Sequence, residues 1–273
     1  MSCSVTDTRH MAEAIRLARR GLYTTSPNPR VGCVIAHGER VVARGFHRRA
    51  GGPHAEVAAL ADARESVAGA TAYVTLEPCS HQGRTPPCAA ALVEAGVSRV
   101  VAAMRDPNPL VAGRGFERLR EAGIAVDCGL LEREAAELNP GFLKRMQTGM
   151  PWVRVKLAMS LDGRTAMADG TSKWITGEAA RADVQKLRAR SCAIVTGIGT
   201  VLHDDPRLDV RIAGEGVAPQ RQPVRVVVDS RLRMPVGARV IGEAGETLVV
   251  TAVRDEARER ALGGAGVTVL HQP

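Results

Sequence analysis

One histidine and two cysteines in the first third of the chain have side chains of the kinds that commonly bind zinc. His54 begins the run HAE, Cys79 follows Pro78, and Cys88 follows two prolines. One imidazole and two thiolates suit Zn²⁺ and leave a fourth position for water. Structural zinc sites usually close with four protein ligands, and the sequence offers no clear fourth. These residues therefore favour a catalytic zinc over a structural site or free core cysteines.

Glu56 adds an acid/base group to this set. It follows His54 by two positions, where zinc-dependent deaminases keep a general acid/base that does not bind the metal. Residues two apart on a regular helix point in nearly opposite directions. The two side chains can converge only if His54 lies in the irregular first turn of its helix, and we predict that it does.

Composition sets the broad class of the protein. The chain has 273 residues, 45% of them hydrophobic, which is enough for two domains with their own cores. Residues 1–20 lack the apolar run of a signal peptide, and no segment approaches ~18 consecutive apolar residues, so we expect a cytoplasmic protein. The net charge is +8, but aromatic residues are only 3%, which argues against nucleic acid as a partner and favours small phosphorylated ligands.

Residues 1–147 are predicted to form one α/β domain. A β-hairpin followed by alternating strands and helices predicts a mixed sheet with helices on both faces. Asp7 is expected to cap the first helix. The expected helices are 7–20, 54–64, 86–95, 115–122 and 131–147, and the expected strands are 31–36, 41–46, 70–76, 98–104 and 124–128.

A linker at residues 147–150 leads to a second α/β domain, residues 151–273. The stretch 213–222 is rich in Gly, Pro and Gln and is expected to be a loop. The expected strands are 152–158, 192–196, 224–229, 247–251 and 267–271, and the expected helices are 177–190 and 255–261.

The segment between the two cysteines departs from the short Pro-Cys-x-x-Cys spacing of zinc deaminases. Eight residues, SHQGRTPP, separate Cys79 from Cys88. This insert resembles the deaminase half of the bifunctional riboflavin-biosynthesis deaminase/reductase family, which implies a cytidine-deaminase-like three-layer α/β/α fold. The resemblance extends over about the first 150 residues, in the blocks PNPRVG (27–32), GGPHAEV (51–57), DPNP (106–109) and GFLKR (141–145).

The second domain resembles the reductase half of the same family, whose fold is dihydrofolate-reductase-like. The matching blocks are KLAMSLDGRTA (156–166), WIT (174–176) and GIGTVLHDDPRL (197–208). The resemblance implies contacts with NADPH from Ala158, Trp174, Thr200, Asp204 and Ser230. It implies contacts with a phosphorylated substrate from Ser172, Arg188, Leu208 and Arg211.

The family implies two reactions, and we expect the chain to form a homo-oligomer. Zinc-dependent hydrolysis would deaminate 2,5-diamino-6-ribosylamino-4(3H)-pyrimidinone 5′-phosphate, with Glu56 moving the protons. NADPH would then reduce the ribosyl group of the product to ribityl. Asn28 and Asn108 carry amides able to contact ring or ribose edges, and His81 and Arg84 are candidates for the 5′-phosphate.

Two other functions are open from the sequence. A nucleic-acid or free-nucleoside deaminase would share the zinc motif, and a non-catalytic ligand sensor would share both folds. The family's reductase half continues beyond the position of Pro273, so we expect an incomplete reductase domain that reduces poorly or not at all.

Overall fold

The structure is a computed structural model that describes residues 3–80, 87–109, 111–212, 221–242 and 244–273. The chain divides into two compact units, Met1–Arg154 and Val155–Pro273, and each is described by itself. Within the described residues, none of the helices has both the length and the apolar character needed to cross a membrane.

The first unit is built on a five-stranded mixed sheet. Its strands are β1 (Gly32–His37), β2 (Arg40–Phe46), β3 (Thr71–Val74), β4 (Arg99–Ala102) and β5 (Ala125–Cys128). Their order is β2-β1-β3-β4-β5, with β1 antiparallel to β2 and β3, and with β3, β4 and β5 parallel. The expected hairpin and mixed sheet are therefore confirmed.

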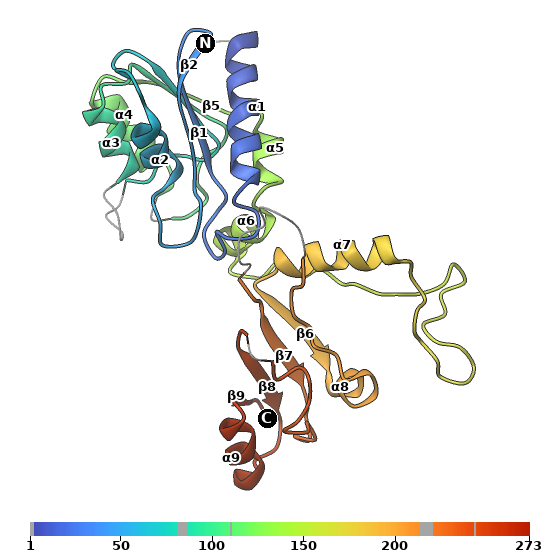
Figure 1. The fold of residues 1–273 in the computed structure, drawn as a ribbon. Helices are drawn as coiled ribbons and strands as arrows, with labels where there is room; N and C mark the ends of the chain where they lie inside the picture. The colour runs from blue at the N-terminus through green and yellow to red at the C-terminus, as the bar shows by residue number, and fades with distance from the viewer. Residues whose placement is uncertain (1–2, 81–86, 110, 213–220, 243) are drawn as a thin grey trace. The chain divides into compact units, whose positions relative to one another are not determined.

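Helices cover both faces of this sheet (Figure 1). They are α1 (Val5–Arg19), α2 (Ala55–Asp62), α3 (Cys88–Glu94), α4 (Arg114–Glu121), α5 (Glu132–Ala136) and α6 (Pro140–Thr148). The three central strands, β1, β3 and β4, are buried on both faces, and successive residues point to opposite sides. On β1, Cys33 and Ile35 pack in the core under α2, α3 and α4, whereas Val34 packs in the core under α1 and α5.

Close backbone packing holds α1 on the sheet. A methyl group at Gly32 would overlap the carbonyl oxygen of Ala14 on α1, so only glycine fits at this point of β1. Ala14 itself is fully buried. The short distance between helix and strand therefore depends on a missing side chain.

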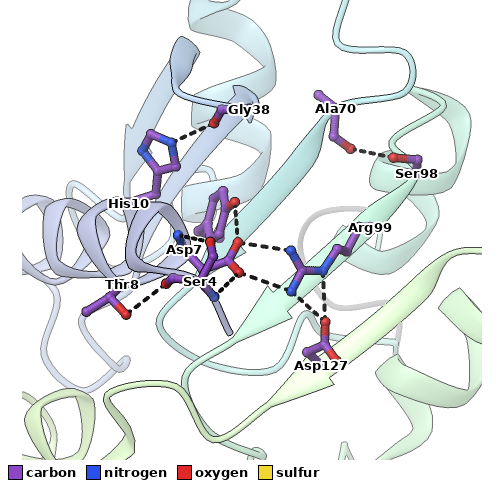
Figure 2. A network of polar contacts seen from close by, with 10 residues as sticks. Ser4, Asp7, Thr8, His10, Gly38, Ala70, Ser98, Arg99 and Asp127 are labelled. Atoms are coloured by element: carbon purple, nitrogen blue, oxygen red, sulfur yellow. Dashed lines mark hydrogen bonds and ion pairs between the residues drawn. The ribbon is translucent and has the colours of Figure 1, made fainter. Parts of the chain in front are cut away.

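A buried polar network fixes the start of α1 against the sheet (Figure 2). The Asp7 carboxylate accepts hydrogen bonds from the Tyr73 hydroxyl at 2.7 Å and from the Arg99 guanidinium at 2.9 Å. Arg99 also pairs with Asp127 at 2.8 Å. One guanidinium thus joins α1, β4 and β5.

The cap of α1 differs from the prediction. Ser4, not Asp7, is the N-cap residue, and the helix begins at Val5. The Ser4 hydroxyl accepts from the Asp7 amide at 3.0 Å, and the Asp7 carboxylate accepts from the Ser4 amide at 2.8 Å. This reciprocal pair is a capping box, with Asp7 as its third helical residue.

The single helix predicted over 131–147 is also wrong. The structure has two short helices, α5 and α6, which break at Asn139 before Pro140. Proline disfavours helical backbone in the residue before it, and it suits the first position of a new helix. Asn139 uses the break, because its amide oxygen accepts from the Arg30 backbone at 2.8 Å.

The second unit contains a parallel four-stranded sheet in the order β6-β7-β8-β9. Its core includes Val227 and Val249 from the two central strands. The elements are α7 (Glu178–Ala189), β6 (Ala193–Gly197), α8 (Ile198–Asp204), β7 (Val224–Val228), β8 (Thr247–Thr251), α9 (Glu256–Gly264) and β9 (Val267–His271).

The strand predicted over 152–158 is absent from the structure, which has no regular element from 151 to 160. The alternating apolar residues that suggested it are exposed: Val153 by 69%, Val155 by 76% and Leu157 by 66%. Alternation marks a segment able to form a strand, but a strand also needs a neighbour for its backbone hydrogen bonds. The predicted loop 213–222 falls largely outside the described residues.

Candidate active site

The three predicted metal ligands come from three different elements of the first unit. His54 is the N-cap of α2 with extended backbone (φ −71°, ψ 167°), Cys88 is the first residue of α3, and Cys79 follows β3. The extended backbone at His54 confirms that this residue lies outside the regular helix. Its side chain therefore does not follow the direction that a regular helix would impose, which would point it away from Glu56.

The donor atoms of these three residues lie close enough to share one ion. The His54 Nδ1 atom is 3.6 Å from the Cys79 Sγ atom and 3.3 Å from the Cys88 Sγ atom, and all three donors lie within 4.8 Å of one another. Zinc bonds of about 2.0 Å to nitrogen and about 2.3 Å to sulfur, at a tetrahedral angle, place the two donors about 3.5 Å apart. The spacing and the donor types therefore fit Zn²⁺.

The local charges favour a thiolate in this group. A hydrogen bond from the Cys88 thiol, together with contacts from His54 and the Cys88 backbone N–H, outweighs burial and lowers the pKa of Cys79 well below its usual value. The same contact with Cys79 raises the pKa of Cys88. The hydrogen bond with Cys79 also raises the pKa of His54. Thiolates are the form in which cysteine binds metals.

Glu56 is a buried carboxyl beside these ligands, with 3% of its surface exposed. Burial, together with the nearby Cys79 charge, raises its pKa to about 7. A group whose pKa lies near the working pH is suited to taking up and releasing protons. The position next to three metal donors makes Glu56 a candidate general acid/base.

His47 is a neighbour of the site that the sequence reasoning missed. Its ring lies 5.5 Å from the His54 ring, centroid to centroid, and is 2% exposed. Its Nδ1 atom donates to the Pro53 carbonyl at 2.9 Å, so its Nε2 atom accepts from the Asn28 side-chain amide at 3.2 Å. Burial lowers the pKa of His47, which agrees with this neutral form. A histidine directly after a strand and seven residues before His54 was the available signal.

The structure describes two of the four other predicted substrate contacts of this unit. The Asn28 side-chain amide contacts His47, which in turn donates to the Pro53 carbonyl just before α2. Asn108 lies in the segment between β4 and α4, where its backbone N–H donates to the Asp106 carboxylate at 2.8 Å. His81 and Arg84 lie outside the described residues.

Glu77 is a second residue that the sequence reasoning left without a role. It lies two residues before Cys79, is 3% exposed, and accepts hydrogen bonds from the backbone around residues 106–116. The signal was a carboxylate three residues after a buried strand and directly before the Pro-Cys pair.

In the second unit, part of the predicted cofactor set lies on or next to α8. Thr200 and Asp204 are both on this helix, and the Lys173 ammonium lies 3.9 Å from the Asp204 carboxylate. Trp174 is 72% exposed, and the Arg181 guanidinium lies 4.5 Å from its ring centroid. The ion pair brings the segment that carries Trp174 to α8.

Three of the four predicted phosphate contacts, Arg188, Leu208 and Arg211, lie around Asp209. The Arg188 guanidinium donates to the Asp209 carbonyl at 3.2 Å, and Arg211 and Arg207 both pair with the Asp209 carboxylate. Leu208 is the buried neighbour with positive φ (53°) that turns the chain here. Three guanidiniums against one carboxylate leave a net positive charge, which suits a phosphate group.

The remaining predicted residues of this unit have separate positions. Ala158 is half-buried in the irregular segment 151–160, and Ser172 is half-buried before Trp174. Ser230 is exposed at the carboxyl end of β7, and its carbonyl accepts from the Ala252 amide at 3.3 Å. Ligands of open parallel sheets commonly bind at this end of the strands.

Known proteins match both units. Residues 4–104 match the family described as the cytidine and deoxycytidylate deaminase zinc-binding region, and residues 151–267 match the RibD C-terminal domain. The riboflavin biosynthesis protein RibD of Escherichia coli is 57% identical over 249 residues, a match that covers 88% of this chain and 68% of the relative. RibD of Haemophilus influenzae is also 57% identical, over 82% of this chain and 62% of the relative.

Solved structures agree with these matches. A structure of Acinetobacter baumannii RibD has a TM-score of 0.91 at 54% identity and covers 98% of this chain and 74% of that chain. The deaminase/reductase of Thermotoga maritima has a TM-score of 0.84 at 36% identity, over 98% of this chain and 81% of that chain. These likenesses confirm a cytidine-deaminase-like domain followed by a domain of the RibD reductase fold. The chain belongs to the RibD family of riboflavin biosynthesis, whose members join a zinc-dependent pyrimidine deaminase and an NADPH-dependent reductase in one polypeptide.

Proposed function

We propose that residues 1–147 deaminate 2,5-diamino-6-ribosylamino-4(3H)-pyrimidinone 5′-phosphate, with His54, Cys79 and Cys88 as the zinc ligands and Glu56 as the acid/base. The observation that carries this proposal is the convergence of one imidazole and two sulfur atoms beside a buried carboxyl. Zinc, when bound there, is a Lewis acid that makes water nucleophilic near neutral pH.

Glu56 then moves protons in both halves of the hydrolysis. It takes one proton from water as the water oxygen bonds to the amine-bearing ring carbon, and it gives that proton to the ring nitrogen. It next carries a proton from the new hydroxyl to the amine, and ammonia leaves as the carbon–nitrogen bond breaks. The raised pKa of about 7 supports this exchange in both directions.

The side chains of Asn28 and Asn108 orient the pyrimidine nucleotide in this proposal, and His81 and Arg84 bind its 5′-phosphate. The His47 contact supports a defined role for Asn28. Because the Asn28 amide nitrogen donates to His47, its amide oxygen is left to accept a hydrogen bond from a substrate N–H or O–H group.

The test of this function is a comparison of substrate classes by ammonia release from the zinc-loaded chain. We expect kcat/KM for the phosphorylated diaminopyrimidine to exceed that for cytidine by at least ~1,000-fold, because a site built for polar groups discriminates strongly against compounds that lack them. Activity confined to cytidine or to tRNA would instead favour a nucleoside or nucleic-acid deaminase.

For residues 151–273 we propose reduction of the deaminated ribosyl intermediate by NADPH. Ala158, Trp174, Thr200, Asp204 and Ser230 would contact the cofactor. The Lys173–Asp204 ion pair supports grouping Trp174 with α8. The test is NADPH oxidation with the deaminated product as the acceptor.

In the same unit, Ser172, Arg188, Leu208 and Arg211 would contact the phosphorylated substrate of the reduction. The arginine cluster around Asp209 supports an anion site there. Inorganic phosphate should inhibit reduction competitively with the substrate if this assignment is correct.

We also propose that the chain forms a homo-oligomer. The apolar side chains of Val153, Val155 and Leu157 are largely exposed, and association commonly buries such surface. Sedimentation equilibrium of the purified chain tests this, and a mass of one chain at micromolar concentration would contradict it.

A further inference from the structure

Glu77 is a buried carboxylate whose recorded hydrogen bonds all come from backbone N–H groups. Its Oε1 atom accepts from Gly113 at 2.9 Å, Gly115 at 3.0 Å and Phe116 at 3.4 Å. Its Oε2 atom accepts from Asp106 at 3.2 Å and from Gly113 at 3.0 Å. Three of these four residues are the N-cap and first turn of α4, where the free N–H groups and the helix dipole favour a negative charge.

These contacts close both ends of the β4–α4 loop, whose described residues are 105–109 and 111–113. The loop leaves the sheet after Met104, whose carbonyl accepts from the Glu77 amide at 3.0 Å. Its first part is held at Asp106 by one carboxylate oxygen of Glu77, and its end is held at Gly113 by both. Inside the loop, the Asp106 carboxylate accepts from the Asn108 backbone N–H. A continuous chain of hydrogen bonds therefore runs from Glu77 to Asn108.

The same residue adjoins the metal-ligand turn. Glu77 is followed by Pro78 and Cys79, and α4 packs directly on this turn. A methyl group at Gly115 would overlap the Pro78 carbonyl oxygen. The backbone that carries Cys79 and the loop that carries Asn108 therefore share one support, the Glu77 carboxylate.

We infer that Glu77 is a positioning residue for substrate binding: it holds the β4–α4 loop against the Cys79 turn, so that Asn108 meets a substrate bound at the metal site. The inference rests on the proposed deaminase function. The hydrogen bonds that the Glu77 carboxylate accepts come from backbone N–H groups and not from a metal-ligand side chain, so its loss should affect substrate affinity while the zinc ligands stay in place.

Replacing Glu77 with glutamine should affect the two ends of the loop differently. A glutamine amide has only one oxygen that can accept hydrogen bonds. Its NH₂ group is a donor and cannot accept from the N–H groups that the second carboxylate oxygen of Glu77 serves. Three N–H groups point at Oε1 and two at Oε2, so the oxygen should stay with α4 and the NH₂ should turn toward the Asp106 N–H. The start of the loop would then be released while α4 keeps most of its cap.

The experiment compares zinc-loaded wild type, Glu77→Gln and the control Asp7→Asn, all assayed as full chains well below their unfolding temperatures. Asp7 is a similarly buried carboxylate in the same domain, but it lies in the network around Arg99 and not at the metal-ligand turn. For Glu77→Gln we expect at least a ten-fold rise in KM, kcat within three-fold of wild type, and one zinc per chain. For Asp7→Asn we expect an unchanged KM and kcat.

Each other outcome is decisive. An unchanged KM in Glu77→Gln, with or without a lower melting temperature, makes the residue purely structural and overturns the inference, as does loss of zinc. If Glu77→Gln does not fold, Asp106→Ala takes its place. It removes the hydrogen bond between the Asp106 carboxylate and the Asn108 N–H, and KM must rise in this variant. A wild-type chain that binds zinc without deaminating would overturn the proposed function and this inference with it, whereas normal wild-type activity with a normal variant overturns the inference alone.

Discussion

Replacing Asp7 with asparagine should destabilise the first unit by removing the charge at the centre of the network in Figure 2. Burial opposes ionisation of Asp7, but hydrogen bonds from the Ser4 backbone, the Tyr73 hydroxyl and Arg99 outweigh it and lower its pKa from 3.8 to about 2. This difference corresponds to about 2 kcal/mol of stability at neutral pH. Arg99 keeps its pair with Asp127 in the variant, so the cost should stay near 2 to 3 kcal/mol, below the ~3–5 typical of a buried pair broken outright.

The sign of the pH dependence makes this prediction specific. A carboxyl with a lowered pKa stabilises the folded state above its unfolded pKa, and the contribution is lost as the pH falls through its folded pKa. The difference in unfolding free energy between wild type and Asp7→Asn should therefore be constant from pH 7 to about pH 5. It should then shrink between about pH 4 and pH 2, where wild-type Asp7 becomes protonated.

Urea unfolding followed by circular dichroism across this pH range measures the difference. At pH 7 the melting temperature of the first unit should fall by about 5–10 °C, given about 2–4 °C per kcal/mol for a domain of this size. A difference that stays constant down to pH 2, or that is absent at pH 7, would refute the reasoning that the ionised carboxylate is the stabilising form.

Three further substitutions test the site and the packing. Cys79→Ala should lose both zinc and deamination, because two ligands remain; full zinc occupancy, measured by mass spectrometry of the metal, would show that the ligand assignment is wrong. Glu56→Gln should keep zinc and fold but lose deamination by at least ~100-fold, the lower end of general acid–base contributions, and near-normal turnover would remove its assigned role. Gly32→Ala should cost about 1–3 kcal/mol, because its methyl group meets the Ala14 carbonyl; a calorimetric melting temperature equal to that of wild type would contradict this close packing.

The convergence of His54, Cys79 and Cys88 beside Glu56 could be predicted from the sequence because the residues that form it are marked by local motifs. Two of the ligands are placed by the start of a helix, and the HAE run brings His54 and Glu56 within two residues. The mixed sheet could also be predicted, because a hairpin followed by alternating strands and helices is typical of such a sheet, whereas the strand order comes from the structure. Two neighbours of the site, His47 and Glu77, were missed because no motif marks their partners. His47 contacts the Asn28 side chain and the Pro53 carbonyl, and Glu77 contacts backbone N–H groups 29 to 39 positions away.

The failures of secondary-structure prediction have separate physical causes. The helix over 131–147 was wrong because apolar periodicity concealed the effect of Pro140 on Asn139. The strand over 152–158 was wrong because alternation shows that a segment can pair, whereas pairing depends on a neighbour elsewhere in the fold. The cap of α1 was assigned three residues late because Asp7 and Ser4 are both good caps, and only the backbone geometry separates them.

The central claim is that this chain deaminates a phosphorylated pyrimidine with one zinc held by His54, Cys79 and Cys88. The most direct test is a titration of metal-free chain with zinc, followed by ammonia release from 2,5-diamino-6-ribosylamino-4(3H)-pyrimidinone 5′-phosphate. The rate should rise in proportion to added zinc and reach a plateau at one zinc per chain. Ammonia release that is independent of zinc, or none at full occupancy, would contradict the claim.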